Sequence, residues 1–207
     1  MGQGVGHPKL PDLVATFLFQ QRNPGAIDIP DVSKCPKVVD PGYSFNSAVA
    51  TFYAPSDLSG VNGMHQQHIH ASSLWRNGSL RYDCVFVEKD PTLPGFQGLF
   101  VTQVLLFSSF HYRNVYYPCA LVQWFTPIGS GPCAKTGMWI VEHEYDEFDN
   151  HLVNVIHLDS ILRPAHLIGV YGKEFIPHDL QCSDSLSAFH SFYVNKYSDY
   201  HAFQLAF

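Results

Sequence analysis

Bulky apolar and β-branched residues recur in short runs along residues 81–172, and turn-forming residues separate the runs. Runs of this kind predict β-strands, because such side chains pack well on a pleated surface. Five strands are expected at 82–88, 99–110, 115–125, 137–142 and 153–161, with a short closing strand at 167–171. Strands at such regular spacing, joined by short loops, favour an antiparallel barrel or sandwich over a parallel sheet.

The segment before this block predicts a helix, a connector and one more strand. Apolar residues at helical spacing predict a helix from Pro11 to just before Asn23. The proline-rich residues 26–43 have little periodicity and predict an extended connector. Residues 45–55 predict a strand that ends at a proline, and residues 66–73 predict one or two helical turns.

The C-terminal part predicts a second helix. Asp184 is a suitable N-cap for a helix at 185–197, and the apolar tail 200–207 is expected to pack back as a strand or a helical turn. The chain therefore divides into an N-terminal helix with its connector, 1–43, and a β-rich domain, 44–207. The predicted fold is mainly β: a small antiparallel, partly open barrel, similar in architecture to SH3-like or BAH-like (bromo-adjacent-homology) barrels, with an N-terminal and a C-terminal helix.

The composition is apolar for a chain of 207 residues, because 46% of the residues are hydrophobic and 14% are charged, against a usual charged share of about 25%. We expect part of this apolar surface to face a partner or other parts of a longer polypeptide. The formal charge of −6 argues against a free-standing nucleic-acid binder, whose affinity comes from neutralising phosphates.

Cysteine usage and hydropathy bear on the compartment. The five cysteines are widely spaced and form no C-x-x-C pair, which fits neither a disulfide framework nor a zinc ribbon. No stretch approaches about 18 uninterrupted apolar residues, and the N-terminus lacks the basic flank and apolar stretch of a secretory signal. These features predict an intracellular protein with reduced thiols and no membrane contact.

The candidate metal ligands are His65, His68 and His70, three nearby imidazoles that could present nitrogen atoms to Zn²⁺. A metal-dependent or hydrolytic enzyme centred on them is the alternative function. The competing interpretation is a set of partly exposed histidines, since no Asp, Cys or further His follows before Trp75. The acidic run 142–150 lacks the central Gly of a calcium loop and favours a solvated hairpin loop.

Four aromatic residues of the strand block are candidates for a binding cage. Such a cage would hold a methylated lysine by cation-π attraction, as a chromatin reader does. The alternative is that the rings fill the interior of a small barrel. The four residues are Tyr82, Trp124, Phe125 and Trp139.

Several phrases of the sequence, taken together and in order, carry a resemblance that covers the chain from about Leu10 to its end. They lie at 45–60, 63–64, 82–87, 117–125, 136–141, 156–161, 165–167 and 192–197. In combination they resemble the C-terminal region of large proteins encoded by fungal DNA transposons of the Plavaka type, which are related to CACTA elements.

The resemblance implies a module without catalytic residues or a cofactor of its own. In such transposon-encoded proteins the catalytic carboxylates belong to an upstream RNase-H-like domain, which nothing in this chain matches. The implied role is interaction or scaffolding, in contact with other domains of a transposase, DNA ends or chromatin proteins, and therefore a nuclear location. The acidic balance makes direct DNA contact the least favoured of these roles.

Overall fold

The computed structural model describes residues 7–26, 28–38, 42–55, 60–75, 78, 80–172, 178–181 and 184–207. Its elements in chain order, with η for a 3-10 helix, are α1 (Leu10–Arg22), η1 (Val32–Lys34), β1 (Tyr43–Phe45), β2 (Ser47–Tyr53), β3 (Met64–Ser72), β4 (Arg81–Tyr82), β5 (Cys84–Glu88), η2 (Gly95–Gly98), β6 (Leu99–Tyr112), β7 (Val115–Pro127), β8 (Ile140–His143), β9 (Val153–His157), η3 (Leu158–Ser160), β10 (Ile161–Ala165), β11 (Leu167–Gly169), α2 (Ser185–Ala188), β12 (Ser191–Val194) and α3 (Tyr200–Ala206).

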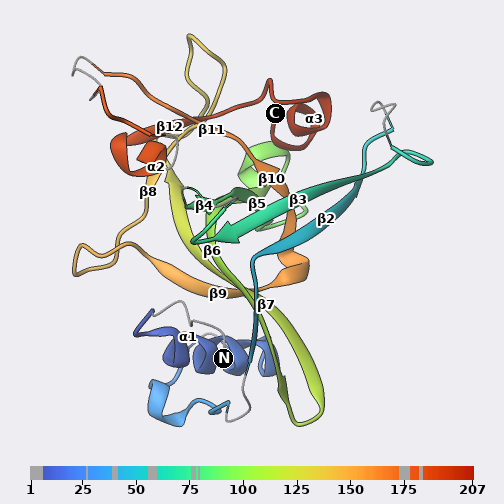
Figure 1. Cartoon of the computed structure of the whole chain (residues 1–207), viewed down its shortest axis with the longest axis vertical. Coiled ribbons are helices and arrows are strands. Elements are labelled where there is room, and N and C mark those ends of the chain that lie inside the picture. The colour runs from blue at the N-terminus through green and yellow to red at the C-terminus, as the bar shows by residue number, and fades with distance from the viewer. Residues whose placement is uncertain are drawn as a thin grey trace.

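A long antiparallel hairpin, β6 and β7, forms the centre of the molecule (Figure 1). Its two-residue turn is Arg113 and Asn114, both with positive φ, at 50° and 63°. Two successive left-handed residues give a turn whose twist matches that of the flanking strands. The two strands pair along nearly their whole length, with one shift of register between Val104 and Leu106, and they supply the template on which the other strands pair.

The main sheet curls into a nearly closed barrel, with strand order β10-β5-β6-β7-β8-β12-β11. The first and last strands of this order, β10 and β11, are separated in the chain by His166 alone. One continuous stretch thus pairs with β5 on one side and with β12 on the other. This arrangement confirms the predicted fold class, mainly β with an antiparallel, partly open barrel and helices near both ends of the chain.

The strand opposite β7 is interrupted. Both β8 and β9 pair with β7, and between them Trp124 bonds with Glu144 and with Leu152, so the chain leaves β7 and returns at the same point. The intervening loop contains most of the predicted acidic hairpin loop, and the Asp146 carboxylate accepts backbone N–H bonds from Phe148 and Asn150 within it. Such a carboxylate cap makes a tight polar turn.

A second, three-stranded sheet, β2-β3-β4, covers the outside of the barrel wall (Figure 1). The alternation of β5 makes the two layers possible, because its successive side chains point to opposite faces. Cys84 and Phe86 join the cluster inside the barrel, whereas Val85 and Val87 join the cluster between the two sheets. A third cluster seats α1 on the barrel through Phe17 and Leu18.

Two predicted helices are strands in the structure. Of the residues predicted as helical turns at 66–73, all but the last belong to β3, which pairs with β2 over seven residue positions. The predicted C-terminal helix at 185–197 is only α2, and the chain then continues as β12, where Phe192 and Val194 point into the barrel. In both cases the short apolar repeats fit the period of a helix as well as that of a strand. Pairing with neighbouring strands stabilises the strand.

The apolar tail packs back on the domain, as the sequence predicted, and it does so as helix α3; the sequence had left a strand or a helical turn open. Helix α3 contacts η2, and Ala206 lies in the cluster inside the barrel, beside Phe96 of η2. Within the described part of the chain, no helix is both long and apolar enough to cross a membrane.

Candidate functional site

A cavity with charged side chains in its wall lies where the small sheet, the barrel edge and the C-terminal segment meet. It has a volume of about 990 Å³, and its lining includes Gln67, Arg81, Asp83, Arg163 and Asp199. We call it the junction cleft. Two charge pairs contribute to its wall: Arg163 with Asp199, and Arg81 with Asp83.

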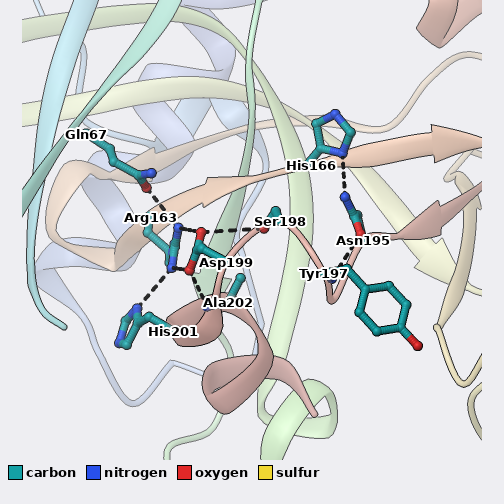
Figure 2. Close-up of polar contacts among 9 residues, drawn as sticks. All are labelled: Gln67, Arg163, His166, Asn195, Tyr197, Ser198, Asp199, His201 and Ala202. Atoms are coloured by element: carbon teal, nitrogen blue, oxygen red, sulfur yellow. Dashed lines mark hydrogen bonds and ion pairs between the residues drawn. The ribbon is translucent and has the colours of Figure 1, made fainter. Parts of the chain in front are cut away.

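Arg163 on β10 is the centre of the first charge pair, and its side chain is 3% exposed. Figure 2 shows its guanidinium group facing the Asp199 carboxylate, to which it donates two hydrogen bonds, one of them 2.8 Å from Nη1 to Oδ1. Nη2 also donates to Gln67 Oε1 of β3 at 3.0 Å. A planar guanidinium group suits such two-pronged pairing with a carboxylate. Arg163 thereby links the barrel to the small sheet and to the C-terminal helix.

Asp199 serves the same network as the N-cap of α3. Its Oδ1 accepts the Ala202 backbone N–H at 2.8 Å, while both of its oxygens accept from Arg163. Burial acts to raise the pKa of Asp199, but the hydrogen bonds and the positive charge of Arg163 outweigh it, so the pKa is lowered. The carboxylate therefore stays ionised and occupied, which makes it a poor proton acceptor for catalysis.

An aromatic stack covers the guanidinium group from the side of the small sheet. Arg163 lies over the Phe52 ring at 4.6 Å, and the His201 ring stacks on Phe52 at 4.9 Å between centroids. His201 Nδ1 lies 3.0 Å from Arg163 Nη1, which requires that nitrogen to accept. Burial and the nearby guanidinium lower the pKa of His201 and keep it neutral, although the Asp199 charge opposes them.

The second charge pair joins β3, β4 and the kink before β5. Asp83 accepts the His70 backbone N–H at 2.8 Å, and its Oδ1 accepts from Arg81 Nε at 2.9 Å. His70 Nδ1 lies 3.1 Å from the same carboxylate. Trp75 packs under the Arg81 guanidinium at 4.8 Å. The acid thus holds two strands of the small sheet together where the chain turns into the barrel.

Both carboxylates of the junction cleft are therefore held by several donors and point at partners within the fold. Paired groups of this kind can position neighbouring elements and offer hydrogen bonds to a polar ligand. Among the described residues of the cleft, neither pair presents a nucleophile beside a free base, the geometry that covalent catalysis requires.

No protein-family model and no curated protein matches the chain. The function has to be argued from the residues themselves.

The three histidines of the metal hypothesis lie on β3 but do not converge. Alternation along the strand places His65 on one face and His68 with His70 on the other. The His65 ring packs against Phe52, whereas the His68 and His70 rings are 6.2 Å apart. Among the described residues, no group of three His, Cys, Asp or Glu side chains has the arrangement needed to hold a metal ion.

The four aromatic residues of the cage hypothesis lie on two sides of the barrel wall. Trp124 and Phe125 are neighbours on β7 and point to opposite faces. Phe125 is 1% exposed inside the barrel, where Trp139 also packs, while Tyr82 and Trp124 pack in the cluster between the sheets. The structure does not bring the four rings into one pocket.

Sequence reasoning did not single out Arg163 and Asp199. They are 36 residues apart, and no spacing rule joins a strand arginine to a distant N-cap. The only local signal was Asp199 itself, an acid three residues before the backbone N–H that it caps.

Cys133 was also missed as a reactive group. It lies in the turn before β8, and backbone N–H groups of Thr136 and Lys135, with the Thr136 hydroxyl, lower its pKa to about 7. Burial instead raises the pKa of Cys84 and of Cys119.

We expect Asp199→Asn to lower the free energy of unfolding, because it leaves the buried guanidinium group of Arg163 without a counter-charge. Fully buried pairs lose about 3–5 kcal/mol in this way, and the 37% exposure of Asp199 reduces the expected loss to about 2–3 kcal/mol. Urea unfolding at neutral pH measures it. The pKa of Asp199 is lowered in the folded protein. The contribution of its carboxylate to the stability of the fold is therefore fully present above the ordinary carboxyl pKa, and it disappears as the pH falls through the lowered pKa.

The matched control is Asp159→Asn, whose side chain is 87% exposed and which should change stability by less than about 0.5 kcal/mol. The double variant Arg163→Met with Asp199→Leu removes both charges and should recover part of the loss. A stability of Asp199→Asn equal to that of the control would show that the pair does not hold the fold together.

We expect Cys133 to alkylate much faster than Cys84 or Cys119 at neutral pH, because only the thiolate reacts. The rate at Cys133 should rise through a midpoint near its pKa of about 7. Peptide mass spectrometry after timed iodoacetamide labelling measures each cysteine separately, so the buried thiols serve as internal controls. Equal labelling of Cys133 and Cys84 in the folded protein would contradict the expectation.

Proposed function

We propose that this chain is a non-catalytic interaction module, and that it binds an extended segment of a partner protein along β2. The observation that carries the proposal is an exposed apolar stripe on this strand. Val49 and Tyr53 are 48% and 62% exposed on the outward face of β2, and Thr51 lies exposed between them. The opposite face packs inward on the barrel through Ala50 and Phe52.

The stripe continues beyond β2 in both directions along the ribbon. Tyr43 and Phe45 of β1 are 64% and 47% exposed, and Met64 of β3, paired with Tyr53, is 42% exposed. Folded monomers rarely leave large apolar patches open to water, and extended ones mark contact surfaces. A partner that covers this stripe would remove its apolar side chains from water.

The backbone of β2 offers a second kind of contact. In the described part of the chain β2 is an edge strand of the small sheet, and it pairs only with β3. Native proteins usually protect such edges with charges or prolines. Residues 43–54 contain no charged side chain and no proline, so nothing in this stretch opposes pairing with another strand. An extended peptide can add a strand there, with backbone hydrogen bonds for affinity and alternate side chains on the stripe for specificity.

An uncharged apolar stripe also sets the chemistry of the partner segment. It should be extended, rich in β-branched or aromatic residues at every second position, and weakly charged. Nucleic acid has the opposite character, since its backbone requires cationic side chains.

The role agrees with the resemblance to transposon-encoded proteins. We propose that the module belongs to a protein of the fungal Plavaka type, and that its partner is another domain of the transposase or a chromatin protein. A nuclear location follows from that proposal. The apolar, weakly charged composition supports a surface made to be covered.

We expect peptides selected on the folded domain from a random displayed library to bind along β2. Val49→Lys should weaken the binding of such a synthetic peptide by at least about tenfold, because it places a charge in the middle of the contact. Fluorescence anisotropy measures the dissociation constant, and amide shifts in an NMR titration should cluster on β2 and β3.

The control is Tyr116→Lys, which changes a residue of similar exposure, 51%, at the far end of the β6–β7 hairpin. It should leave the affinity unchanged. Peptides that bind Val49→Lys as tightly as the wild type, or shifts that avoid β2, would place the contact elsewhere and remove this assignment.

We expect the genomic setting to reveal the transposon origin. Near-identical copies of the reading frame should recur downstream of transposase-coding sequence and between inverted repeats. Genome sequence from the source organism provides the observation. A single locus without such flanks would contradict the transposon origin. The peptide-binding proposal does not depend on that result, because the binding measurement tests it separately.

A further inference from the structure

One end of the barrel interior is polar and is partly covered by α2. The interior side chains at this end are Gln103 of β6, Gln123 of β7 and His143 of β8. Leu186 of α2 and Phe189 just after it pack against the apolar cluster inside the barrel. The short segment 185–190 therefore sits over the mouth of the barrel.

Leu186 stands between two cavities. The junction cleft, about 990 Å³, and a second cavity of about 540 Å³ both include Gln103 and Leu186 in their walls. Removing the segment from the mouth would join the two volumes into one site that opens onto the barrel interior. Ligand sites often lie in the mouths of β-barrels, so this closure has consequences for access.

His143 holds the segment in place with a hydrogen-bond pattern that requires a neutral ring. Its Nε2 lies 2.8 Å from the Leu186 carbonyl oxygen, which can only accept, so Nε2 carries the proton. Its Nδ1 lies 3.0 Å from Gln123 Nε2, an amide donor, so Nδ1 must accept. A second proton on the ring would place two donors against each other at Nδ1.

The groups around His143 add to the cost of protonating it. His151, whose ring centroid lies 4.7 Å away, and His190, which follows α2, act electrostatically on His143 and disfavour a second proton on its ring. Glu142 lies 3.7 Å from His190 Nδ1, and Tyr145 stacks on His151 at 4.8 Å. The Glu142 carboxylate is therefore paired with His190.

We propose that segment 185–190 is a pH-sensitive gate over the barrel mouth, latched at neutral pH by the two hydrogen bonds of neutral His143, to the Leu186 carbonyl and from Gln123, and released when protonation places two donors against each other at Nδ1. Opening the gate joins the two cavities and exposes the polar interior side chains to solutes. The gate does not depend on the peptide-binding role.

The titration of His143 has the sign that this gate needs. Burial lowers the pKa of His143, the bond to Leu186 opposes the shift, and the charges of His151 and His190 add to it. A ring with a lowered pKa in the closed state stabilises that state fully above the ordinary histidine pKa. The stabilisation disappears as the pH falls from that value through the lowered pKa.

Hydrogen exchange measured by mass spectrometry on the full chain tests the gate. After correction for intrinsic exchange rates, the protection of residues 185–190 should fall by about tenfold between about pH 7.5 and about pH 5.5, while β6 and β7 keep theirs. NMR of the imidazole groups should show the Nε2–H tautomer of His143 at the higher pH. Unchanged protection of 185–190 would overturn the proposal.

Two variants separate the latch from a general effect of acid. Gln123→Glu replaces the donor at Nδ1 with an acceptor, so a protonated His143 would keep both bonds and the gate should stay protected in acid. His151→Gln removes a neighbouring charge but leaves the latch, and should keep most of the pH response. If Gln123→Glu does not fold, His143→Gln, whose amide can both donate and accept, should abolish the response. A response that survives in the folded latch variant, or that disappears with His151→Gln alone, would overturn the proposal.

Discussion

The pairing of Arg163 with Asp199 is the contact on which the arrangement of the parts depends. The barrel, the small sheet and the C-terminal helix are separate in the chain, and the guanidinium group of Arg163, on barrel strand β10, contacts the other two through Asp199, Gln67 and the Phe52 ring. A charge that is 3% exposed is tolerated only with a counter-charge and well-placed acceptors. The position of α3, and with it the closure of that end of the barrel, follows from satisfying Arg163.

Burial on both faces of the barrel wall accounts for much of the apolar composition. Strands β5, β6 and β7 send alternate side chains inward and outward, and both sets lie in apolar clusters. Such strands read as nearly continuous apolar runs in the sequence, without a polar face. Part of the apolar excess that first suggested a missing partner is therefore used within the fold, and the exposed stripe on β1 and β2 is one of the apolar surfaces that remain open to contact.

The long strands and the first helix could be predicted because each carries a strong local pattern. The β6–β7 hairpin has long β-branched runs and a two-residue turn, and α1 has one clear apolar face. The segments 66–73 and 185–197 could not be predicted, since their few apolar residues fit both periods and the neighbouring strands decided the outcome. For the site, the acidic residues and arginines can be identified in the sequence. Which of them pair with each other depends on how the barrel folds. The histidines were visible as a cluster, and the two-residue alternation of a strand separated them.

The interruption between β8 and β9 has a consequence for the history of the fold. Because the chain departs and rejoins beside Trp124, where Glu144 and Leu152 bond to each other, the length of the excursion has no effect on the register of either half with β7. Sequence can be lost or inserted at this point without shifting a single inward-facing side chain. Divergent copies of this domain should differ in length there first, while the barrel on either side keeps its pairing.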